Sequence, residues 1–384
     1  MLRLSHDETE QFSEHQGQRG TYFTTFSFTA LRAIEANFRP GSIITLLPNI
    51  QYISWEARSP TLMYAFLTRT TRLKEIKLTV FVPGLANPTN TNLLLGASLP
   101  ASLVKIRLEL WGFEDKTEVY GFFDRLNCRP RLLHLSLPLN VPSRKMITAL
   151  GNFKVLRHLE MGLTPAIKLD EVVDSIALNL TVLQDLRFII ESDYDEADGV
   201  AIIPFDYLRP LLRLTNLTAL YIFHEKAVLM TEDDVISMGQ AWPMMQTLHF
   251  PSTIEVEDQG IPLRWLNSFA KAFPFLQNLS IHIHDFDTTP TAESPVSPFP
   301  RLRTLAVGSS ATEGADLGEV AVFLGDVCTP GVMILSVEWD EQDYFESSFE
   351  RKPSDATLPF WDNVGSVVKA IHQRQAVIMR QATH

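Results

Sequence analysis

The chain has 384 residues, of which 45% are hydrophobic and 20% are charged, and its net charge is −12 with an isoelectric point near 5.3. The apolar content suffices for a large core, while the acidic excess disfavours phosphate backbones and anionic membrane surfaces. We therefore expect no nucleic acid and no membrane among the partners.

Residues 1–21 are polar and rich in glutamine, so they predict a flexible amino-terminal segment. Charges also stand where a secretory signal needs an apolar stretch, which predicts a cytoplasmic or nuclear protein. In that compartment the two cysteines, Cys128 and Cys328, are expected to be unpaired thiols. Next along the chain, residues 22–28 predict a degenerate first strand, and residues 29–38 predict a helix.

From residue 50 onward one short phrase recurs: an apolar residue, two variable residues, an apolar residue, one variable residue and a third apolar residue. Clear copies begin at Leu73, Leu103, Leu132, Leu156, Leu183, Leu217, Met245, Leu276 and Leu302, and weaker copies at Ile50 and Val332. Successive copies begin 23 to 34 residues apart. This is the period of a leucine-rich repeat with loops of variable length.

Segments with helical spacing lie between the copies. They cover residues 61–68, 119–126, 143–153, 169–178, 205–214, 231–242, 263–273 and 315–327. Thr231 precedes three acidic residues, which marks a capped helix start, and Pro243 marks the end of the same helix.

A strand and a helix in every unit predict an α/β leucine-rich-repeat solenoid. Strands joined by a helical crossover pair in parallel, with the helices outside. Because helices are wider than strands, the stack should curve into a horseshoe with parallel strands on the concave face and helices on the convex face. We expect about eleven irregular units over residues 22–340.

The carboxy-terminal residues 341–384 are expected to close the stack. An acidic loop begins at Asp340, and apolar residues at helical spacing then run from Phe360 to about Gln381. Since an array needs its last apolar edge covered, we predict that this helix is the carboxy-terminal cap.

The variable residues of each phrase alternate with the apolar ones and should therefore point to the concave surface. Side chains that suit a protein interface occupy many of these positions: Lys77, Lys105, Arg107, His134, His158, Arg187, Tyr221, His249 and His282. We predict that they form a protein-binding face. The alternative is that they are ordinary solvated positions of a curved sheet.

Catalytic and cofactor motifs are missing from the sequence. It has no glycine-rich phosphate loop and no nucleophile elbow, so we predict no enzyme, no cofactor and no catalytic residue. His282 and His284, with Asp285 or Asp287, have a spacing that hints at a metal. A strand end that enters a loop explains the same residues, and we predict no metal site.

Three units carry a resemblance to a known family. Residues 46–49 read Leu-Leu-Pro-Asn before a strand that ends at Trp55, and residues 273–276 and 299–302 share a Phe-Pro-x-Leu lead-in. These units resemble the irregular leucine-rich repeats of fungal F-box-type proteins. The resemblance implies a protein substrate held by the repeats, and an amino-terminal F-box that docks on a Skp-type adaptor and a cullin. The chain before Phe38 lacks that signature, so an F-box would lie upstream or has been lost.

Three functions follow as hypotheses. The leading one is a protein–protein recognition module, the substrate-binding part of an F-box-type ubiquitin-ligase adaptor. The second is a stand-alone leucine-rich-repeat scaffold or regulator without ligase recruitment. The third, an enzyme built on repeats, requires an activity that one or two polar substitutions abolish.

Overall fold

The computed structural model describes fifteen parts of the chain. They are residues 2–4, 33–37, 51–57, 72–81, 102–111, 131–137, 150–163, 168–190, 203–224, 228–250, 260–286, 296–307, 310, 315–335 and 357–382. The chain divides into two compact units, Met1–Leu163 and Thr164–His384. The predicted boundaries after residues 21 and 340 lie outside the described residues, as do the predicted strand 22–28, the predicted helices 61–68 and 119–126, most of 143–153 and Cys128.

The first unit contains a ladder of parallel strands in which each strand pairs with the next along the chain. The strands are β1 (Leu2–Leu4), β2 (Ala33–Asn37), β3 (Tyr52–Ala57), β4 (Glu75–Phe81), β5 (Lys105–Trp111), β6 (His134–Leu137) and β7 (His158–Leu163). Equivalent positions of the phrase face one another, as in the pair Ile76 and Ile106. The repeat thus sets the register of the sheet.

Strand β1 lies within residues 1–21, and the flexibility expected of that segment stays a prediction. The helix expected over residues 29–38 is wrong, because strand β2 occupies Ala33–Asn37. The reason is visible in the sequence, because Leu31, Ile34 and Ala36 repeat the phrase with a small residue in its third apolar position. Ile34 accordingly pairs with Ile53 of the next repeat.

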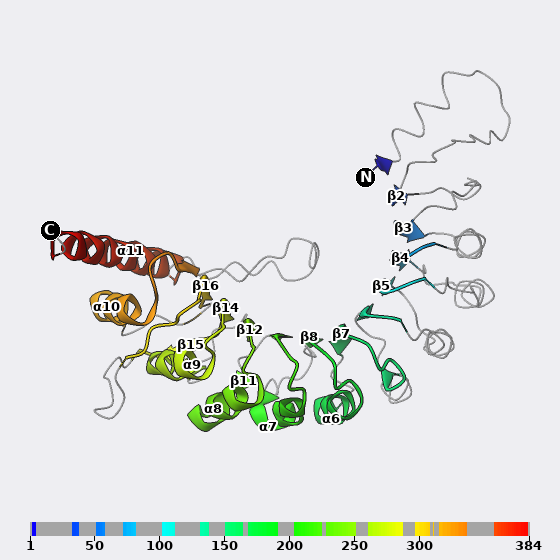
Figure 1. Cartoon of the computed structure of the whole chain (residues 1–384), viewed down its shortest axis with the longest axis horizontal. Coiled ribbons are helices and arrows are strands. Elements are labelled where there is room, and N and C mark those ends of the chain that lie inside the picture. The colour runs from blue at the N-terminus through cyan, green and yellow to red at the C-terminus, as the bar shows by residue number, and fades with distance from the viewer. Residues whose placement is uncertain are drawn as a thin grey trace, which may run out of the picture. The chain divides into compact units, whose positions relative to one another are not determined.

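The second unit repeats this ladder, and helices connect its strands (Figure 1). Its paired strands are β8 (Asp185–Ile190), β10 (Ala219–Phe223), β12 (Thr247–His249), β14 (Asn278–Ser280), β16 (Thr304–Ala306) and β17 (Met333–Leu335). Its helices are α6 (Leu169–Asn179), α7 (Phe205–Leu208), η1 (Arg209–Arg213), α8 (Glu232–Ala241), η2 (Leu263–Trp265), α9 (Leu266–Ala272), α10 (Leu317–Val327) and α11 (Thr357–Ala382). The strands of this unit line its inner side and helices α6 to α10 its outer side (Figure 1).

Two short strand pairs accompany the main ladder of the second unit. One joins β9 (Ile203–Pro204) to β11 (Val228–Leu229), and the other joins β13 (Ile261–Pro262) to β15 (Ile283–Asp285). The predicted helices 169–178, 205–214, 231–242, 263–273 and 315–327 are all observed, two of them as a 3-10 turn joined to a short α-helix. The architecture is an α/β leucine-rich-repeat solenoid.

Each repeat is tied to the next by the backbone just before the strand. The carbonyl of Gln184 accepts hydrogen bonds from the amides of Thr218 and Ala219 at 2.8 and 3.0 Å, and the carbonyl of Thr218 does the same for the following repeat. The apolar residues of the phrase are buried behind these strands, as Leu217, Leu220 and Ile222 illustrate with no exposed surface. Burial of this continuous row holds the repeats together, because no single repeat has a core of its own.

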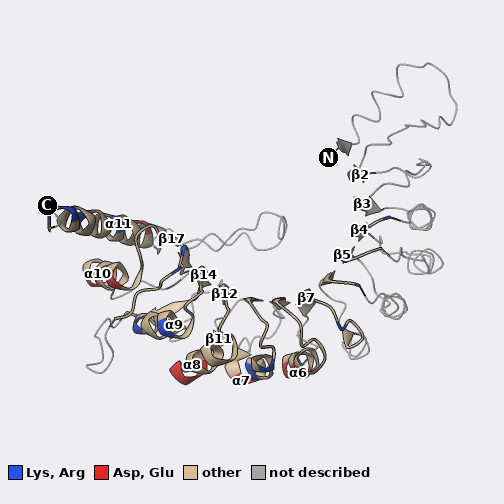
Figure 2. Cartoon of the chain, viewed as in Figure 1, with Lys and Arg blue, Asp and Glu red and all other residues tan. Residues whose placement is uncertain are grey.

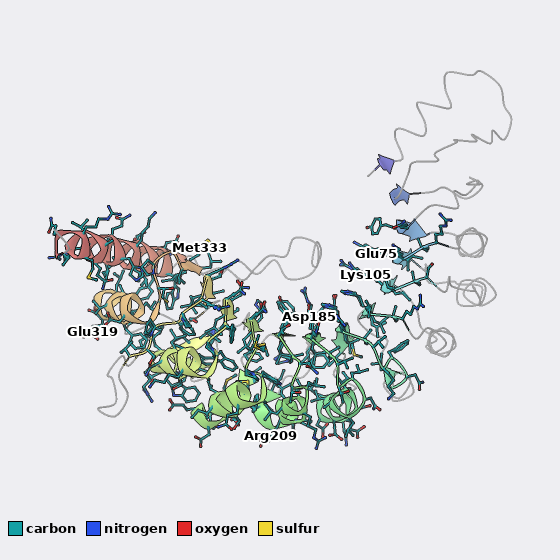
Figure 3. The ribbon with its side chains drawn as sticks, viewed as in Figure 1. Glu75, Lys105, Asp185, Arg209, Glu319 and Met333 are labelled. Carbon is teal, nitrogen blue, oxygen red and sulfur yellow. The ribbon has the colours of Figure 1, made fainter. Side chains whose placement is uncertain are left out.

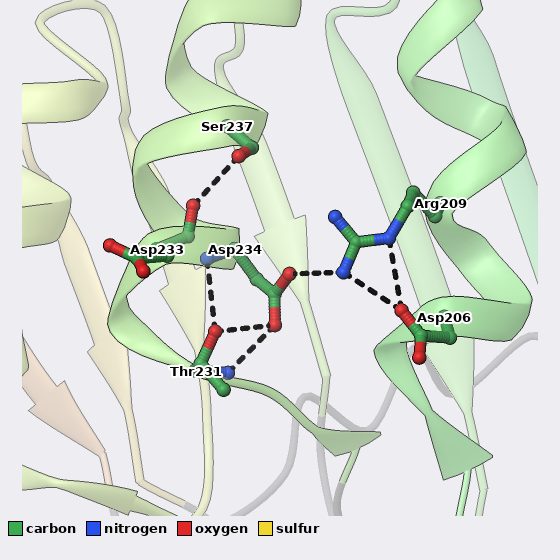
Figure 4. Close-up of polar contacts among 6 residues, drawn as sticks. All are labelled: Asp206, Arg209, Thr231, Asp233, Asp234 and Ser237. Carbon is green, nitrogen blue, oxygen red and sulfur yellow. Dashed lines mark hydrogen bonds and ion pairs between the residues drawn. The ribbon is translucent and has the colours of Figure 1, made fainter.

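Helix α8 shows how neighbouring repeats are also linked on the helix side (Figure 4). The Thr231 hydroxyl accepts from the Asp234 amide, while the Asp234 carboxylate accepts from the Thr231 amide at 2.9 Å and from its hydroxyl at 2.7 Å. The same carboxylate accepts from Arg209 of the preceding repeat at 2.8 Å. Arg209 also donates to Asp206, so one guanidinium joins two helices.

The long helix α11 confirms the helical pattern predicted from Phe360 to about Gln381. It packs against α10 and β17, and it buries Trp361, Val364 and Val368. That it acts as the cap of the array remains a prediction. In the described part of the chain, no helix combines the length and the apolar character that crossing a membrane requires.

Candidate functional site

The strand face of the first unit carries charged residues and histidines in register. Position by position, Glu75 faces Lys105, Lys105 faces His134 and His134 faces His158. Lys105 and Glu75 form an ion pair of 2.7 Å between neighbouring strands (Figure 3). In the adjacent column, Lys77 faces Arg107. All the predicted site residues of this unit therefore lie in two adjacent columns.

His134 and His158 stack on each other with ring centroids 3.8 Å apart and an angle of 3° between the rings. They are register partners on β6 and β7, so the strand spacing itself brings the two rings together. Both side chains are half-buried. The pair forms a stacked aromatic patch on the strand face.

The second unit carries a tighter group, which we call the aromatic cluster: Arg187 on β8, Tyr221 and Phe223 on β10, and His249 on β12. Arg187 lies over the Tyr221 ring, with its guanidinium carbon 4.3 Å from the ring centroid, and its Nε donates to Asp185 at 3.4 Å. The rings of Tyr221 and Phe223 lie 6.1 Å apart and nearly parallel. His249 completes the cluster, at 5.6 Å from Tyr221 and 4.7 Å from Phe223.

A hollow of about 40 Å³ opens beside this cluster. Its lining comes from β10, β12 and β14 and consists of Tyr221, Phe223, Thr247, Leu248, His249, Asn278, Leu279 and Ser280. The hollow arises from a step in side-chain size, since Tyr221 is followed in register by His249 and then by Ser280. Asn278 donates to Thr247 at 3.3 Å on the other side of the hollow.

Two residues of this lining each have a polar atom that is buried without a hydrogen-bond partner among the described residues. The two atoms are Nε2 of His249 and Oγ of Ser280, and these two residues are only 5% and 3% exposed. Burial, followed by the nearby charge of Arg187, lowers the pKa of His249 to about 3. The imidazole is therefore neutral at physiological pH.

Exposure was expected for all the predicted site residues, and this expectation is wrong for His249 and His282. His249 is covered by the rings of Phe223 and Tyr221. His282, which is 3% exposed, lies beyond the end of β14, where the chain turns into the second strand pair. Gly260 packs on it so closely that a Cβ there would lie 2.8 Å from the imidazole.

The suspected metal ligands around His282 do not assemble in the described residues. Asp285 pairs with Arg264 at 3.1 Å, and Asp287 lies outside the described part of the chain. Burial, followed by the neighbouring His284, lowers the pKa of His282 to about 4. Across the described ranges, no three His, Cys, Asp or Glu side chains gather closely enough to hold a metal ion.

Phe223 is a member of the cluster that the repeat phrase does not include. The phrase ends at Ile222, but strand β10 continues for one more residue. Because Phe223 stands two residues after Tyr221, alternation along the strand places both on the same face. Extending the alternation past the third apolar residue would have identified it.

Charge is distributed unevenly in the second unit. Helix α8 begins with three acidic residues and α9 carries one lysine, whereas β12 and β14 carry no charged residue (Figure 2). Arg187 and Asp185, on the neighbouring strand β8, contact each other. The strand face around the hollow is consequently aromatic and neutral.

No protein-family model and no curated protein sequence matches the chain. Among solved structures, the chain is similar to a TLR13–ssRNA13 complex, at 17% identity and a TM-score of 0.42 over 79% of this chain. The chain spans 41% of that protein's length. Another similar structure is the leucine-rich-repeat-containing protein LegL7 from Legionella pneumophila, at 11% identity and a TM-score of 0.38. That match covers 79% of this chain and 89% of LegL7. The strand ladder and its repeats make this chain a leucine-rich-repeat solenoid.

Proposed function

We propose that this chain recognises a protein partner through the strand face of its repeats, and that the aromatic cluster anchors the partner. The proposal rests on the contacts that Arg187, Tyr221, Phe223 and His249 make with one another across β8, β10 and β12. Arginine and large aromatic side chains contribute most to protein interfaces, because aromatic rings bury much area and the guanidinium can donate several hydrogen bonds. Here the strands already hold them in place, which lowers the entropy that binding costs.

The position of the cluster supports the same proposal. Tyr221 and Phe223 are half-buried rather than sealed in the core, so their rings remain accessible on the inner side of the second unit. The charged columns of the first unit, with Lys77, Lys105, Arg107, His134 and His158, offer complementary polar contacts. Charged residues of this kind set the orientation and specificity of a partner more than its affinity.

The leading assignment within this function is the substrate-binding part of an F-box-type ubiquitin-ligase adaptor. What supports it is the style of the repeats, with a Leu-Leu-Pro-Asn entry and Phe-Pro-x-Leu lead-ins. In this assignment a Skp-type adaptor and a cullin bind through an F-box elsewhere in the protein. A stand-alone scaffold that binds the same partner without a ligase is the second assignment.

The test combines Arg187→Ala with Tyr221→Ala in the tagged full-length protein and quantifies the proteins that co-purify with it from its own cells. We expect at least a tenfold loss of one or more specific partners. The chain offers a matched control on the helix side, Arg213→Ala with Tyr207→Ala. Tyr207 is 45% exposed and Arg213 makes an exposed pair with Asp174 at 2.9 Å, so these changes alter the same residue types without disturbing the core.

Retention of every partner by the strand-face variant, or equal losses in both variants, would contradict the proposal. A Skp-type adaptor and a cullin among proteins bound by both variants would support the ligase assignment. If neither is bound, while another partner is lost from the strand-face variant, the result would favour the stand-alone scaffold.

A further inference from the structure

Helix α11 carries a regular apolar seam along one side. Trp361, Val364, Val368 and Ile371 follow one another at alternating steps of three and four residues. This spacing is typical of a helix–helix contact, because it keeps one line of side chains on the same side of a helix. The first three side chains are buried, and Ile371 packs so closely on Gly325 of α10 that a Cβ there would lie 3.2 Å from it. The seam is thus a packing surface within the second unit.

The same seam continues into an exposed part of α11. Its next positions are Gln375 and Ile378, and Met379 stands four residues after Gln375 on the same side. The contact with α10 includes His372, whose Nε2 lies 3.0 Å from a carbonyl oxygen of that helix. Every residue from 373 to 381 is exposed, with Ile378 at 53% and Met379 at 69%. Apolar side chains therefore face solvent in line with an existing helix–helix contact.

Positive charge lies on both sides of this exposed seam. Helical spacing places Arg374 next to Ile378 on one side, and it places Lys369 and Arg380 together on the other. Residues 363–384 contain no Asp or Glu, although the whole chain has a net charge of −12 (Figure 2). An apolar seam between two rows of cations is complementary to a helix whose apolar seam is flanked by carboxylates.

Two other occupants fit this surface less well. A second copy of the chain would bring its own Arg374 and Arg380 against the same cations, which repel them. A membrane is disfavoured because the exposed seam offers two large apolar side chains, whereas an interfacial helix buries a wide apolar face. The net charge of −12 also opposes approach to an anionic surface. Charge complementarity therefore favours an acidic protein helix.

We propose that the exposed end of α11 is a docking site for an acidic amphipathic helix of a partner protein. The partner helix extends the contact that α10 makes with α11, and its apolar seam covers Ile378 and Met379. Its carboxylates pair with Arg374 and Arg380. This inference does not rest on the proposed function, because α11 lies outside the strand ladder.

The test uses three synthetic helical peptides of equal length. One has a leucine seam with Glu on both flanks, the second has the same seam with Lys flanks, and the third has a serine seam with Glu flanks. Fluorescence anisotropy measures the affinity of each peptide for the full chain. The leucine peptide with Glu flanks should bind at least fivefold more tightly than either of the others, because it alone matches both the seam and its charges.

Two sets of variants place this binding on α11. Ile378→Ala combined with Met379→Ala should weaken it at least fivefold, whereas the control Val377→Ala, at a 52% exposed position on the opposite side of the helix, should leave it unchanged. Alanine favours helix, so circular dichroism should show α11 intact in all of them.

Charge reversal supplies the second set. Arg374→Glu with Arg380→Glu should reverse the preference, so that the peptide with Lys flanks binds more tightly than the peptide with Glu flanks. The matched control Lys154→Glu with Arg157→Glu reverses two exposed cations of the first unit and should keep the original preference.

Four outcomes would overturn the inference. They are equal affinities for the three peptides, no binding of any peptide, the same loss in Val377→Ala as in the seam variant, and an unchanged preference after reversal of Arg374 and Arg380. Tighter binding to vesicles of phosphatidylserine and phosphatidylcholine would instead assign the seam to a membrane. A dimer in sedimentation velocity that the seam variant dissociates would assign it to a second copy, and either result also overturns the inference. Partner capture by the strand face is measured separately, so failure here is distinguishable from failure of the proposed function.

Discussion

Two aspartates that bind the same arginine should differ sharply in their contribution to stability. Arg209 donates to Asp206 and to Asp234 at the same distance of 2.8 Å, yet the Asp234 side chain is 8% exposed and the Asp206 side chain 74%. The change is Asp234→Ala, and Asp206→Ala is its matched control. Both remove a carboxylate from the same guanidinium, but only Asp234 also caps a helix (Figure 4).

The magnitude follows from the contacts that each carboxylate makes. Asp234 accepts two hydrogen bonds from Thr231, each worth about 1 kcal/mol net. Its pair with Arg209 adds no more than about 1 kcal/mol, because the guanidinium is half exposed and screened by water. Removing a buried charge is itself favourable and offsets part of this sum, so Asp234→Ala should lower the free energy of unfolding by about 2 kcal/mol. Asp206→Ala should cost below about 0.5 kcal/mol, as is usual for an exposed pair.

Urea unfolding followed by far-UV circular dichroism and by tryptophan fluorescence measures both free energies. Fluorescence is informative because the buried Trp242 stands at the end of α8 and donates to the Leu211 carbonyl in the preceding repeat. Equal costs for the two variants, or a larger cost for Asp206→Ala, would refute the reasoning that burial and capping decide the contribution of this link.

Three further outcomes are expected. Leu220→Ala removes a fully buried side chain whose register partners are Leu186 and Leu248, and urea unfolding should show a cost of about 2 to 5 kcal/mol. The control Val182→Ala, at a half-exposed position, should cost below about 1 kcal/mol. An equally small cost for Leu220→Ala would place Leu220 outside the core. The folded pKa values of His249 and His282, about 3 and about 4, lie below that of an unfolded histidine. The unfolded chain therefore binds more protons, and the free energy of unfolding should rise with pH up to about pH 6.5. His249→Leu should reduce this slope by up to about 1.4 kcal/mol per pH unit, and an unchanged slope would mean that His249 is accessible to protons in the folded state. Burial raises the pKa of the Cys328 thiol to about 12, which makes the thiol unreactive in the native protein. After treatment with iodoacetamide, peptide mass spectrometry should show Cys328 unmodified in the native protein and modified in urea. Modification at equal rates would contradict its burial.

The repeat phrase predicted most of the architecture because it encodes both burial and register. Leu186, Leu220 and Leu248 occupy the same position of successive copies, and the structure places them side by side in the ladder. The capped start of α8 was also readable, since Thr231 and Asp234 interact over three residues. The strand ladder was therefore predictable from the fixed period of the repeat, and the start of α8 from residues close together in the sequence.

What the sequence did not reveal depends on departures from the period or on contacts between repeats. Strand β2 was not predicted, because Ala36 is a weak third apolar residue of the phrase. His282 was predicted on the exposed strand face, but the chain leaves the ladder after Ser280. The link between Arg209 and Asp234 joins residues 25 positions apart on two helices, and no local pattern predicts it. The hollow likewise results from a step in size across three strands, which no single repeat displays.

Site-specific cross-linking tests most directly whether the strand face is the recognition surface. A photoreactive phenylalanine analogue at position 221 lies in the aromatic cluster, and the same analogue at position 207 lies on α7 on the helix side. Illumination in the protein's own cells should join position 221, and not position 207, to a specific protein that the Arg187→Ala and Tyr221→Ala combination loses. Cross-links from position 207 alone, or from neither position while the partner is still captured, would contradict the assignment of the strand face.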